Sequence, residues 1–565
     1  MSAADRTTSL RAVRATAWIV GVLGALVQAV VYRVWVNADS TSYLDMSDAV
    51  LTGDWHRLVN ATWSPLYPAL IGLARLPYQT PAWDFPSAHL VNFLSFVFAF
   101  ATFELLLRAL LDASEARARE TGGEALPRAA LAAVGYALFL WASLGMLSLM
   151  KPTPDMLMSG LLYLAVWLLV RIGAGRDDAR TLVLFGIVLG VGYLAKAIMF
   201  PLGVVMIGMT LLMRGTLSRR LTRAAIAGGA MLLVAAPYVA AVSARAGHPT
   251  FGDAGKVVHL TFVDRATPPG IWAQLNDASG QPVRPARQIH AKPATFAYPA
   301  SNLSVTRSVW FDPALSAQGL RTGFNVRSQV DVLRANVGVY LRVILELATL
   351  LVVLAMVVVA VRGRGAVETL LAHWTVWGTA VVALAAYALI HVETRYIGML
   401  FALIWLGVLC GVRLTRPVAP SLVRGLTAAV VINLVLVTGW YAARDYRDNR
   451  TKTRLGDLEA GLALNALGVG PEAHVARIND VVADGWARLG RVNIVAEVLR
   501  SQAGAFWKAS PEVQRSVLDS LAATGARAAV AHVRPAYGAL PAGWTPLGRS
   551  EYAVHLLSPP QVGAR

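Results

Sequence analysis

The chain has 565 residues, of which 56% are hydrophobic and only 15% are charged. A soluble globular domain carries about 25% charged residues, so this composition excludes an ordinary soluble protein and indicates one that resides in lipid. The net charge of +18 comes from arginines in short clusters between apolar runs, which argues against nucleic-acid binding. The single cysteine, Cys410, excludes an intrachain disulfide and a thiolate metal site.

Apolar runs of roughly 20 residues, each long enough to cross a bilayer, recur along the chain. The first covers about 15–36 and lacks a small-residue cleavage site, so we interpret it as an uncleaved helix rather than a signal peptide. A polar and aromatic loop follows at about 37–87. Helices two, three and four are expected at about 88–111, 129–149 and 155–170. Helices five and six form a close pair around Lys196 and Pro201, and helix seven ends near Ser243.

A long loop at about 244–336, rich in proline and aromatic residues, precedes the last helices. Helix eight is expected at about 337–361, helix nine ends near Ile390, helix ten follows the segment 391–396, and helix eleven ends near Tyr441. The predicted fold is therefore a polytopic α-helical membrane protein with about eleven transmembrane helices, whose membrane domain covers residues 1–441.

The arginine clusters predict the orientation of these helices. If the N-terminus is cytoplasmic, six short clusters all fall on the cytoplasmic side, as the positive-inside rule requires. The loops at 37–87 and 244–336, the turn at 391–396 and the C-terminal region then lie outside. We therefore expect a multi-pass protein of the bacterial inner membrane. No internal repeat of the kind common in transporters is visible.

Residues 442–565 regain charges, and their apolar runs are shorter. Helices are expected at about 458–467 and 511–524, and short strands at about 474–478, 492–498 and 528–533. Alternating strands and helices predict a small α/β domain on the extracytoplasmic side. It contains no glycine-rich phosphate loop, so a nucleotide-binding role has weak support.

Asp39 directly follows the first helix and is the first candidate for chemistry. Burial at a membrane surface can tune the pKa of such a carboxylate towards the working range of a base. The alternative is a solvated carboxylate that caps the next helix. Tyr43, Leu44, Met46 and Val50 recur at helical spacing, which predicts an amphipathic helix lying on the membrane surface.

The order Asp39, Tyr43, Gly53-Asp54-Trp55 and a proline-rich start of the following helix resembles the GT-C superfamily of membrane glycosyltransferases. The similarity is greatest to the branch that holds the protein O-mannosyltransferases and the bacterial transferase that adds aminoarabinose to lipid A. Such enzymes take a sugar from a polyprenyl-phosphate carrier on the outer face of the membrane. The resemblance covers about residues 15–440 in layout and implies that Asp39 is the catalytic base.

Three later segments match the same family in order. Lys151-Pro152-Thr153-Pro154-Asp155 opens helix four, Gly192-Tyr193-Leu194-Ala195-Lys196 resembles the family's Leu-Thr-Lys turn, and Glu393-Thr394-Arg395-Tyr396 resembles its Arg-Tyr segment. The resemblance implies that cations here bind the donor phosphate, and the candidates are Lys196, Arg395 and Lys151. The candidates for substrate binding or support are Tyr43, Asp45, Asp155, His391, Glu393 and Tyr396.

One departure concerns the first outer loop, where Trp63-Ser64 precedes Pro65 and the aminoarabinose transferase has Glu-Lys. A charge pair is therefore missing from the site, which leaves the donor sugar and the details of phosphate binding open.

Each candidate also has a structural alternative. Lys196 could snorkel to the outer interface, and Arg395 could form an ion pair with Glu393 or Asp155. Asp155 could serve as the N-cap of helix four, and His391 could be a hydrogen-bonded structural residue.

Glycosyl transfer from a lipid phosphate needs a base for the acceptor hydroxyl and cations for the departing phosphate, and the candidate residues supply both. We therefore predict an inverting, lipid-carrier-dependent glycosyltransferase whose partners are a lipid-linked sugar donor, membrane lipids and a lipid, glycan or protein acceptor. No metal or other cofactor is predicted, although some relatives in the superfamily use a divalent ion. The alternatives are a secondary transporter or lipid flippase and a non-catalytic envelope scaffold.

Overall fold

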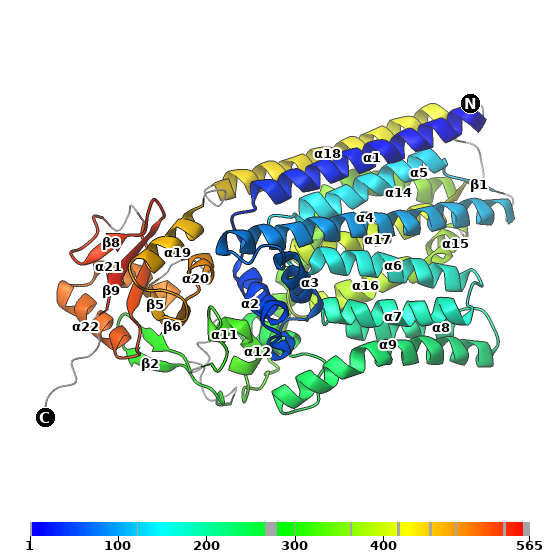
Figure 1. Ribbon diagram of the computed structural model, residues 1–565. Coiled ribbons are helices and arrows are strands. Elements are labelled where there is room, and N and C mark those ends of the chain that lie inside the picture. The colour runs from blue at the N-terminus through cyan, green and yellow to red at the C-terminus, as the bar shows by residue number, and fades with distance from the viewer. Residues whose placement is uncertain are drawn as a thin grey trace, which may run out of the picture.

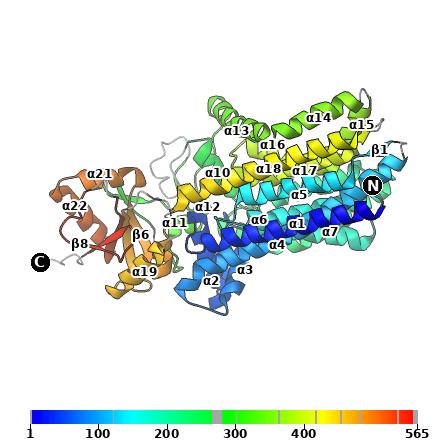
Figure 2. The same cartoon turned by 90° about the horizontal axis from the view of Figure 1, so that it is seen from above.

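The computed structural model describes residues 3–120, 123–265, 280–299, 301–361, 364–414, 418–450, 455–478, 481, 483–534 and 538–557. A long helical bundle carries a smaller, sheet-containing part beyond one end, and the N-terminus lies at the opposite end (Figures 1 and 2). Residues 266–279 of the expected long outer loop lie outside the described part.

Seven helical runs in the described part are long and apolar enough to cross a membrane, so the chain is a multi-pass membrane protein. They are Ser9–Val31 of α1 (Ala3–Val31), α4 (Pro81–Glu120), α5 (Arg128–Leu140) with the π-helical turn Trp141–Leu147, α6 (Asp155–Gly173), α9 (Leu217–Ala246), α17 (Thr394–Gly411) and α18 (Pro420–Asn449).

The predicted number of eleven is not established, because the remaining apolar helices are short or broken. They are α7 (Ala179–Ala195), α8 (Met199–Leu212) and α16 (Trp374–Ala388), with 14 to 17 residues each. The prediction of a single helix at 337–361 is wrong. The structure has two helices there, α13 (Val326–Glu346) and α14 (Ala348–Val361), with a bend of 70° at the break between them.

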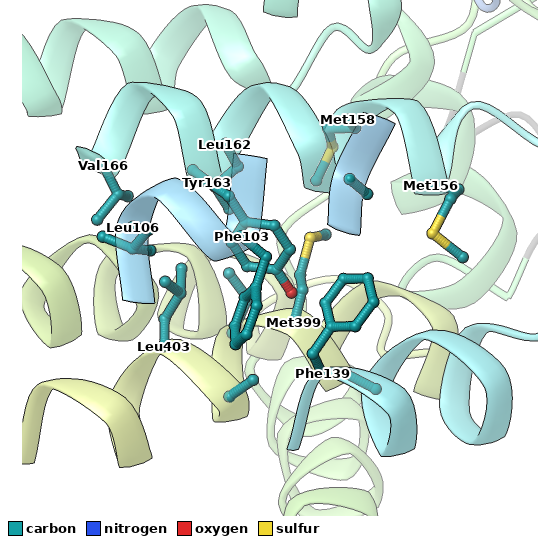
Figure 3. Close-up of a cluster of buried hydrophobic side chains, with 14 of the residues drawn as sticks. Phe103, Leu106, Phe139, Met156, Met158, Leu162, Tyr163, Val166, Met399 and Leu403 are labelled. Carbon is teal, nitrogen blue, oxygen red and sulfur yellow. The ribbon is translucent and has the colours of Figure 1, made fainter. Parts of the chain in front are cut away.

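Side chains from α4, α5, α6 and α17 form the core of the bundle (Figure 3). The ring of Phe103 lies 4.9 Å from that of Phe139 and 5.2 Å from that of Tyr163. Gly160 on α6 allows close approach to α4, because a Cβ there would meet the ring of Phe98 at 2.6 Å. This packing brings α6 and α17 together, and both helices begin at the sheet end of the bundle.

The arginine-rich ends of the helices gather at the other end of the bundle. There β1 (Glu124–Ala125) pairs with β4 (Arg413–Leu414), which joins the loops that follow α4 and α17 (Figure 1). Nearby, Asp177 accepts from Arg219 at 2.6 Å and from Arg223 at 2.7 Å. The clusters therefore share one side, as the sequence predicted.

The sheet-containing part has a seven-stranded sheet in the order β2-β3-β6-β5-β7-β9-β8. The strands are β2 (Arg287–His290), β3 (Thr295–Ala297), β5 (His474–Ile478), β6 (Asn493–Val498), β7 (Ala528–His532), β8 (Trp544–Pro546) and β9 (Tyr552–Leu556). β5 is parallel to β6 and β7, and the other pairs are antiparallel.

The helices and strands predicted between 458 and 533 are confirmed, because α19 (Gly456–Ala466), β5, β6, α22 (Pro511–Ala522) and β7 lie at those positions. The same region contains α20 (Gly485–Gly490) and α21 (Ala503–Lys508). β8 and β9 were not predicted. β2 and β3 come from the second outer loop, so residues 442–565 alone do not form the sheet.

The remaining helices lie mostly at the sheet end of the bundle. They are α2 (Ala38–Thr52), α3 (Leu66–Arg75), α10 (Ala254–Phe262), α11 (Ser308–Phe311), α12 (Pro313–Ser316) and, at the opposite end, α15 (Arg364–Ala372).

The helix predicted after Asp39 is present as α2, but its predicted place on the membrane surface is wrong. Tyr43, Leu44 and Met46 are at most 4% exposed, and the polar side chains of Ser40 and Ser47 are buried as well. The cause is tertiary, because α3, α4, α11 and α20 all contact α2. Periodicity reveals an apolar face, but it does not reveal what covers the polar one.

Candidate active site

Four predicted residues meet at the sheet end of the bundle. Asp39 lies in the first turn of α2, and Asp155 is the first residue of α6. Lys196 caps the C-terminus of α7, and Arg395 lies in the first turn of α17. Each occupies a helix end, so the packing of α6 against α7 and α17 brings the four side chains together.

The Arg395 guanidinium is the centre of this cluster. Its Nη2 atom lies 3.4 Å from Oδ2 of Asp39, and its Nη1 atom lies 3.8 Å from Oδ2 of Asp155. On a third side its Nε atom lies 2.7 Å from Oε2 of Glu393. The Arg395 side chain is 13% exposed. Arg395 therefore forms the ion pairs considered from the sequence, and it also holds Asp39.

Lys196 does not snorkel freely to the interface. Its ammonium group forms an ion pair with Asp155 and lies 4.1 Å from the centre of the Tyr396 ring. Asp155 also accepts from Oγ1 of Thr153 at 2.7 Å. The N-cap of α6 is Pro154, so Asp155 is an ion-pair residue rather than the cap of its helix.

Aromatic rings enclose the ion cluster. Tyr396 stacks on Tyr387 with ring centroids 5.2 Å apart, and its hydroxyl accepts from Arg395 at 3.1 Å. His391 stacks on Phe262 at 3.7 Å, and its Nε2 atom lies 3.5 Å from Oε1 of Glu393. These contacts hold the predicted residues Tyr396 and His391 at the rim of the cluster. Tyr43 projects from α2 and packs against Trp63 and Tyr67, with 5.5 Å between ring centroids in both pairs.

Asp39 and Glu393, the two carboxylates beside Arg395 that lie outside the membrane-spanning helices, have pKa values shifted in opposite directions. Burial raises the pKa of Asp39, and the charge of Arg395 offsets part of that rise. Burial also acts to raise the pKa of Glu393, but the His391 hydrogen bond and Arg395 outweigh it and lower that pKa to about 2. Asp39 is thus moved towards the range of a general base, whereas Glu393 remains a permanent anion.

A cavity of about 400 Å³ lies beside the cluster, between α13, α18, the π-helical turn and the start of α17. Four cationic side chains line it, and these are Lys151, Arg342, Arg395 and Arg444. Among the three predicted phosphate-binding cations, Lys151 and Arg395 therefore face the cavity, whereas Lys196 is turned to Asp155.

Several lining residues were not predicted as site residues. Arg342 and Glu346 lie one turn apart on α13, and Arg444 and Asp445 lie in the last two turns of α18. The hydroxyl of Tyr441 donates to Oε1 of Glu346 at 2.8 Å. Charged residues within or next to apolar runs are a signal of function in membrane proteins and could have identified them.

Asp45 does not join the Asp39 cluster. Its Oδ1 atom lies 2.9 Å from Nη1 of Arg488 on α20, and its carboxylate also accepts from the backbone and hydroxyl of Thr306 at 2.9 and 2.8 Å. It therefore links α2 to the sheet-containing part.

Within the residues that the structure describes, no group of three His, Cys, Asp or Glu side chains could hold a metal ion. The expectation that no cofactor is needed stays a prediction.

No protein-family model and no curated protein matches this sequence. Two solved structures resemble the chain over its whole length. They are crystal structures of ArnT from Cupriavidus metallidurans, one in the apo state and one bound to undecaprenyl phosphate. Both give a TM-score of 0.51, cover 98% of this chain and 100% of ArnT, and are 16% and 15% identical in sequence.

ArnT is a membrane glycosyltransferase of the GT-C superfamily. This chain shares its fold with ArnT and therefore has a GT-C-like fold. The resemblance inferred from the sequence is confirmed at the level of the fold.

Proposed function

We propose that this chain is an inverting glycosyltransferase that moves a sugar from a polyprenyl-phosphate carrier to an acceptor hydroxyl at the outer face of the inner membrane. One observation carries the proposal. The carboxylate of Asp39 lies 3.4 Å from Arg395, and the same arginine lines a cavity together with Lys151, Arg342 and Arg444. A base and a phosphate-binding group therefore lie side by side, in a fold shared with ArnT, which has been crystallised with undecaprenyl phosphate.

The reaction is a single displacement at the anomeric carbon. The acceptor oxygen attacks that carbon from the face opposite the carrier phosphate and forms the new glycosidic bond. The bond between carbon and phosphate oxygen breaks, and its electron pair leaves with the carrier phosphate. Asp39 takes the hydroxyl proton, and attack from the opposite face inverts the configuration.

The cations act on the leaving group. Arg395 and Lys151 face the cavity, where they stabilise the negative charge that grows on the phosphate oxygen as the bond breaks. Glu393 holds Arg395 from the other side at 2.7 Å, which fixes the guanidinium between the base and the cavity. Lys196 and Asp155 neutralise each other beneath it and support its position.

The test uses purified protein in lipid with radiolabelled polyprenyl-phosphate sugars and a membrane-lipid or periplasmic extract as acceptor source. Wild type should transfer one sugar of the panel. Asp39→Asn should lose about 100-fold or more of that rate, because general bases contribute about 10²- to 10⁴-fold. Binding of undecaprenyl phosphate should survive, since the cavity cations remain.

The matched control is Asp54→Asn. Asp54 lies in the same outer loop and pairs with Arg57 at 3.3 Å, with 34% of its side chain exposed. Its loss should leave transfer unchanged. A well-folded wild type that neither transfers nor binds any donor of the panel would instead favour the transporter or scaffold alternatives.

A further inference from the structure

The proposed base, Asp39, lies on α2, and the contacts that fix α2 are made by residues further along this helix. α2 bears Asp39 in its first turn and Asp45 and Asp48 further along. At about 1.5 Å per residue, Asp45 lies about 9 Å along the helix axis from Asp39. The orientation of the first turn thus depends on what fixes the carboxylates that follow it.

Those carboxylates are bound by an arginine from the sheet-containing part. Nη1 of Arg488 on α20 lies 2.9 Å from Asp45 and 2.7 Å from Asp48, and its Nε atom lies 2.9 Å from Asp84 on α4. Arg488 and Asp45 are 443 residues apart in the chain. The arginine side chain is 4% exposed, so water does not compete for its donors.

A second arginine completes the network. Nη1 of Arg75 on α3 lies 2.7 Å from Asp48, and its Nη2 atom lies 2.9 Å from Asp84. Removing Arg488 would take away the arginine that pairs with Asp45 and leave Asp48 and Asp84 to Arg75, with Nη2 of Arg491 reaching Asp84 at 3.5 Å. Unpaired buried carboxylates are strongly unfavourable, so α2 would shift or loosen to admit water.

We propose that Arg488 is a positioning residue, which acts through the buried carboxylates of α2 to hold Asp39 in place. The inference rests on the proposed function, because it assigns the sheet-containing part a task in the reaction. A displacement of about 1 Å of a catalytic group can lower a rate about 100-fold. Looser docking of α2 should therefore lower kcat, whereas the donor phosphate still meets Arg395 and Lys151 in the cavity.

The experiment compares wild type, Arg488→Lys and the control Arg491→Lys as full-length protein in lipid. Lysine keeps one charge, but its donors sit on a single nitrogen and cannot span the three carboxylates as the planar guanidinium does. Arg491 is the C-cap of the same helix, and its ion pair is with Asp84 on α4. Three quantities are measured: kcat and KM for the donor that wild type uses, the affinity for undecaprenyl phosphate, and hydrogen exchange of the α2 amides.

For Arg488→Lys we expect kcat to fall at least 10-fold, undecaprenyl phosphate affinity to stay within about 3-fold, and the α2 amides to exchange faster. Arg491→Lys should match wild type in all three. If Arg488→Lys is too unstable to purify, Asp45→Asn removes one α2 carboxylate and should show the same pattern more weakly. A wild-type kcat in Arg488→Lys, or equal losses of kcat and affinity, would overturn the positioning role. Absence of transfer by wild type would overturn the proposed function itself.

Discussion

Arg395 and Asp39 are 356 residues apart in the chain, yet Nη2 of Arg395 lies 3.4 Å from Oδ2 of Asp39. On the other side of the same guanidinium, Glu393 approaches Nε at 2.7 Å. Arg395 lowers the pKa of Asp39, which burial has raised, and Glu393 raises it. Two neighbours of opposite charge therefore act on the pKa of the proposed base in opposite directions.

The first prediction concerns the acid limb of kcat/KM against pH. A base works when deprotonated, so activity is lost as the pH falls through its pKa. Arg395→Gln removes a charge that lowers the pKa of Asp39 and should move the acid limb to higher pH. Glu393→Gln removes a charge that raises this pKa and should move the limb to lower pH. The exposed Glu551→Gln is the control, and an acid limb that moves in the same direction in Arg395→Gln and Glu393→Gln would contradict the assignment of Asp39.

The second prediction separates the two lysines of the site. Lys151 lines the cavity, whereas Lys196 is paired with Asp155. A hydrogen bond to a charged group contributes about 1.5–3 kcal/mol, so Lys151→Met should weaken undecaprenyl phosphate binding about 10-fold or more. Lys196→Met should bind within about 3-fold of wild type but unfold at lower temperature, because Asp155 loses a partner.

Binding of labelled undecaprenyl phosphate and thermal unfolding in lipid measure the two effects. Lys508→Met, on the exposed surface of the sheet-containing part, should alter neither. Equal losses of affinity in both site variants would restore Lys196 to the phosphate-binding role that the sequence suggested.

The third prediction concerns the contact of α7 with α9. A Cβ at Gly186 would collide with the backbone carbonyl of Ala227, which cannot move away as a side-chain end can. Gly186→Ala should therefore destabilise the bundle by roughly 1–3 kcal/mol. At Gly208 on α8 a Cβ would meet nothing within 4 Å, so Gly208→Ala should be neutral or stabilise by up to about 1 kcal/mol. Comparable thermal unfolding of the two variants would argue against this helix contact.

The fourth prediction tests the orientation in the membrane. The only native cysteine, Cys410, is buried, so engineered cysteines can be labelled without background. Lys508→Cys should react with a membrane-impermeant maleimide in intact spheroplasts. Arg176→Cys, in the exposed arginine-rich turn after α6, should react only after permeabilisation. The reverse pattern would place the cavity on the cytoplasmic side.

Local patterns were enough to predict a large part of this fold. Apolar runs located the spans, and short alternating elements located α19, β5, β6, α22 and β7. β8 and β2 were missed because runs of three or four residues give little periodicity and depend on their partners in the sheet. The break between α13 and α14 was missed because no proline or glycine lies near Leu347, so no local breaker signal marks it.

The candidate site was predictable where residues lie at helix ends. Asp39 was selected because it follows the first helix, and Asp155, Lys196 and Arg395 because their segments resemble those of the family. The structure brings the four together. Asp45 could not be placed, because its partner Arg488 is 443 residues away and no local pattern connects them. The roles of the candidate site residues in the reaction stay predictions.

The sheet combines strands from two distant segments of the chain, so it cannot form until both have been synthesised. β3 pairs with β6, and the partners Thr295 and Val498 are separated by about 200 residues of chain. At about 5–20 residues per second, the first strands wait on the order of ten seconds or more for their neighbour. During that time the edge of β3 is open while the membrane is still receiving helices. The sheet-containing part therefore closes last, and a nascent chain stopped before β6 would present an unpaired strand.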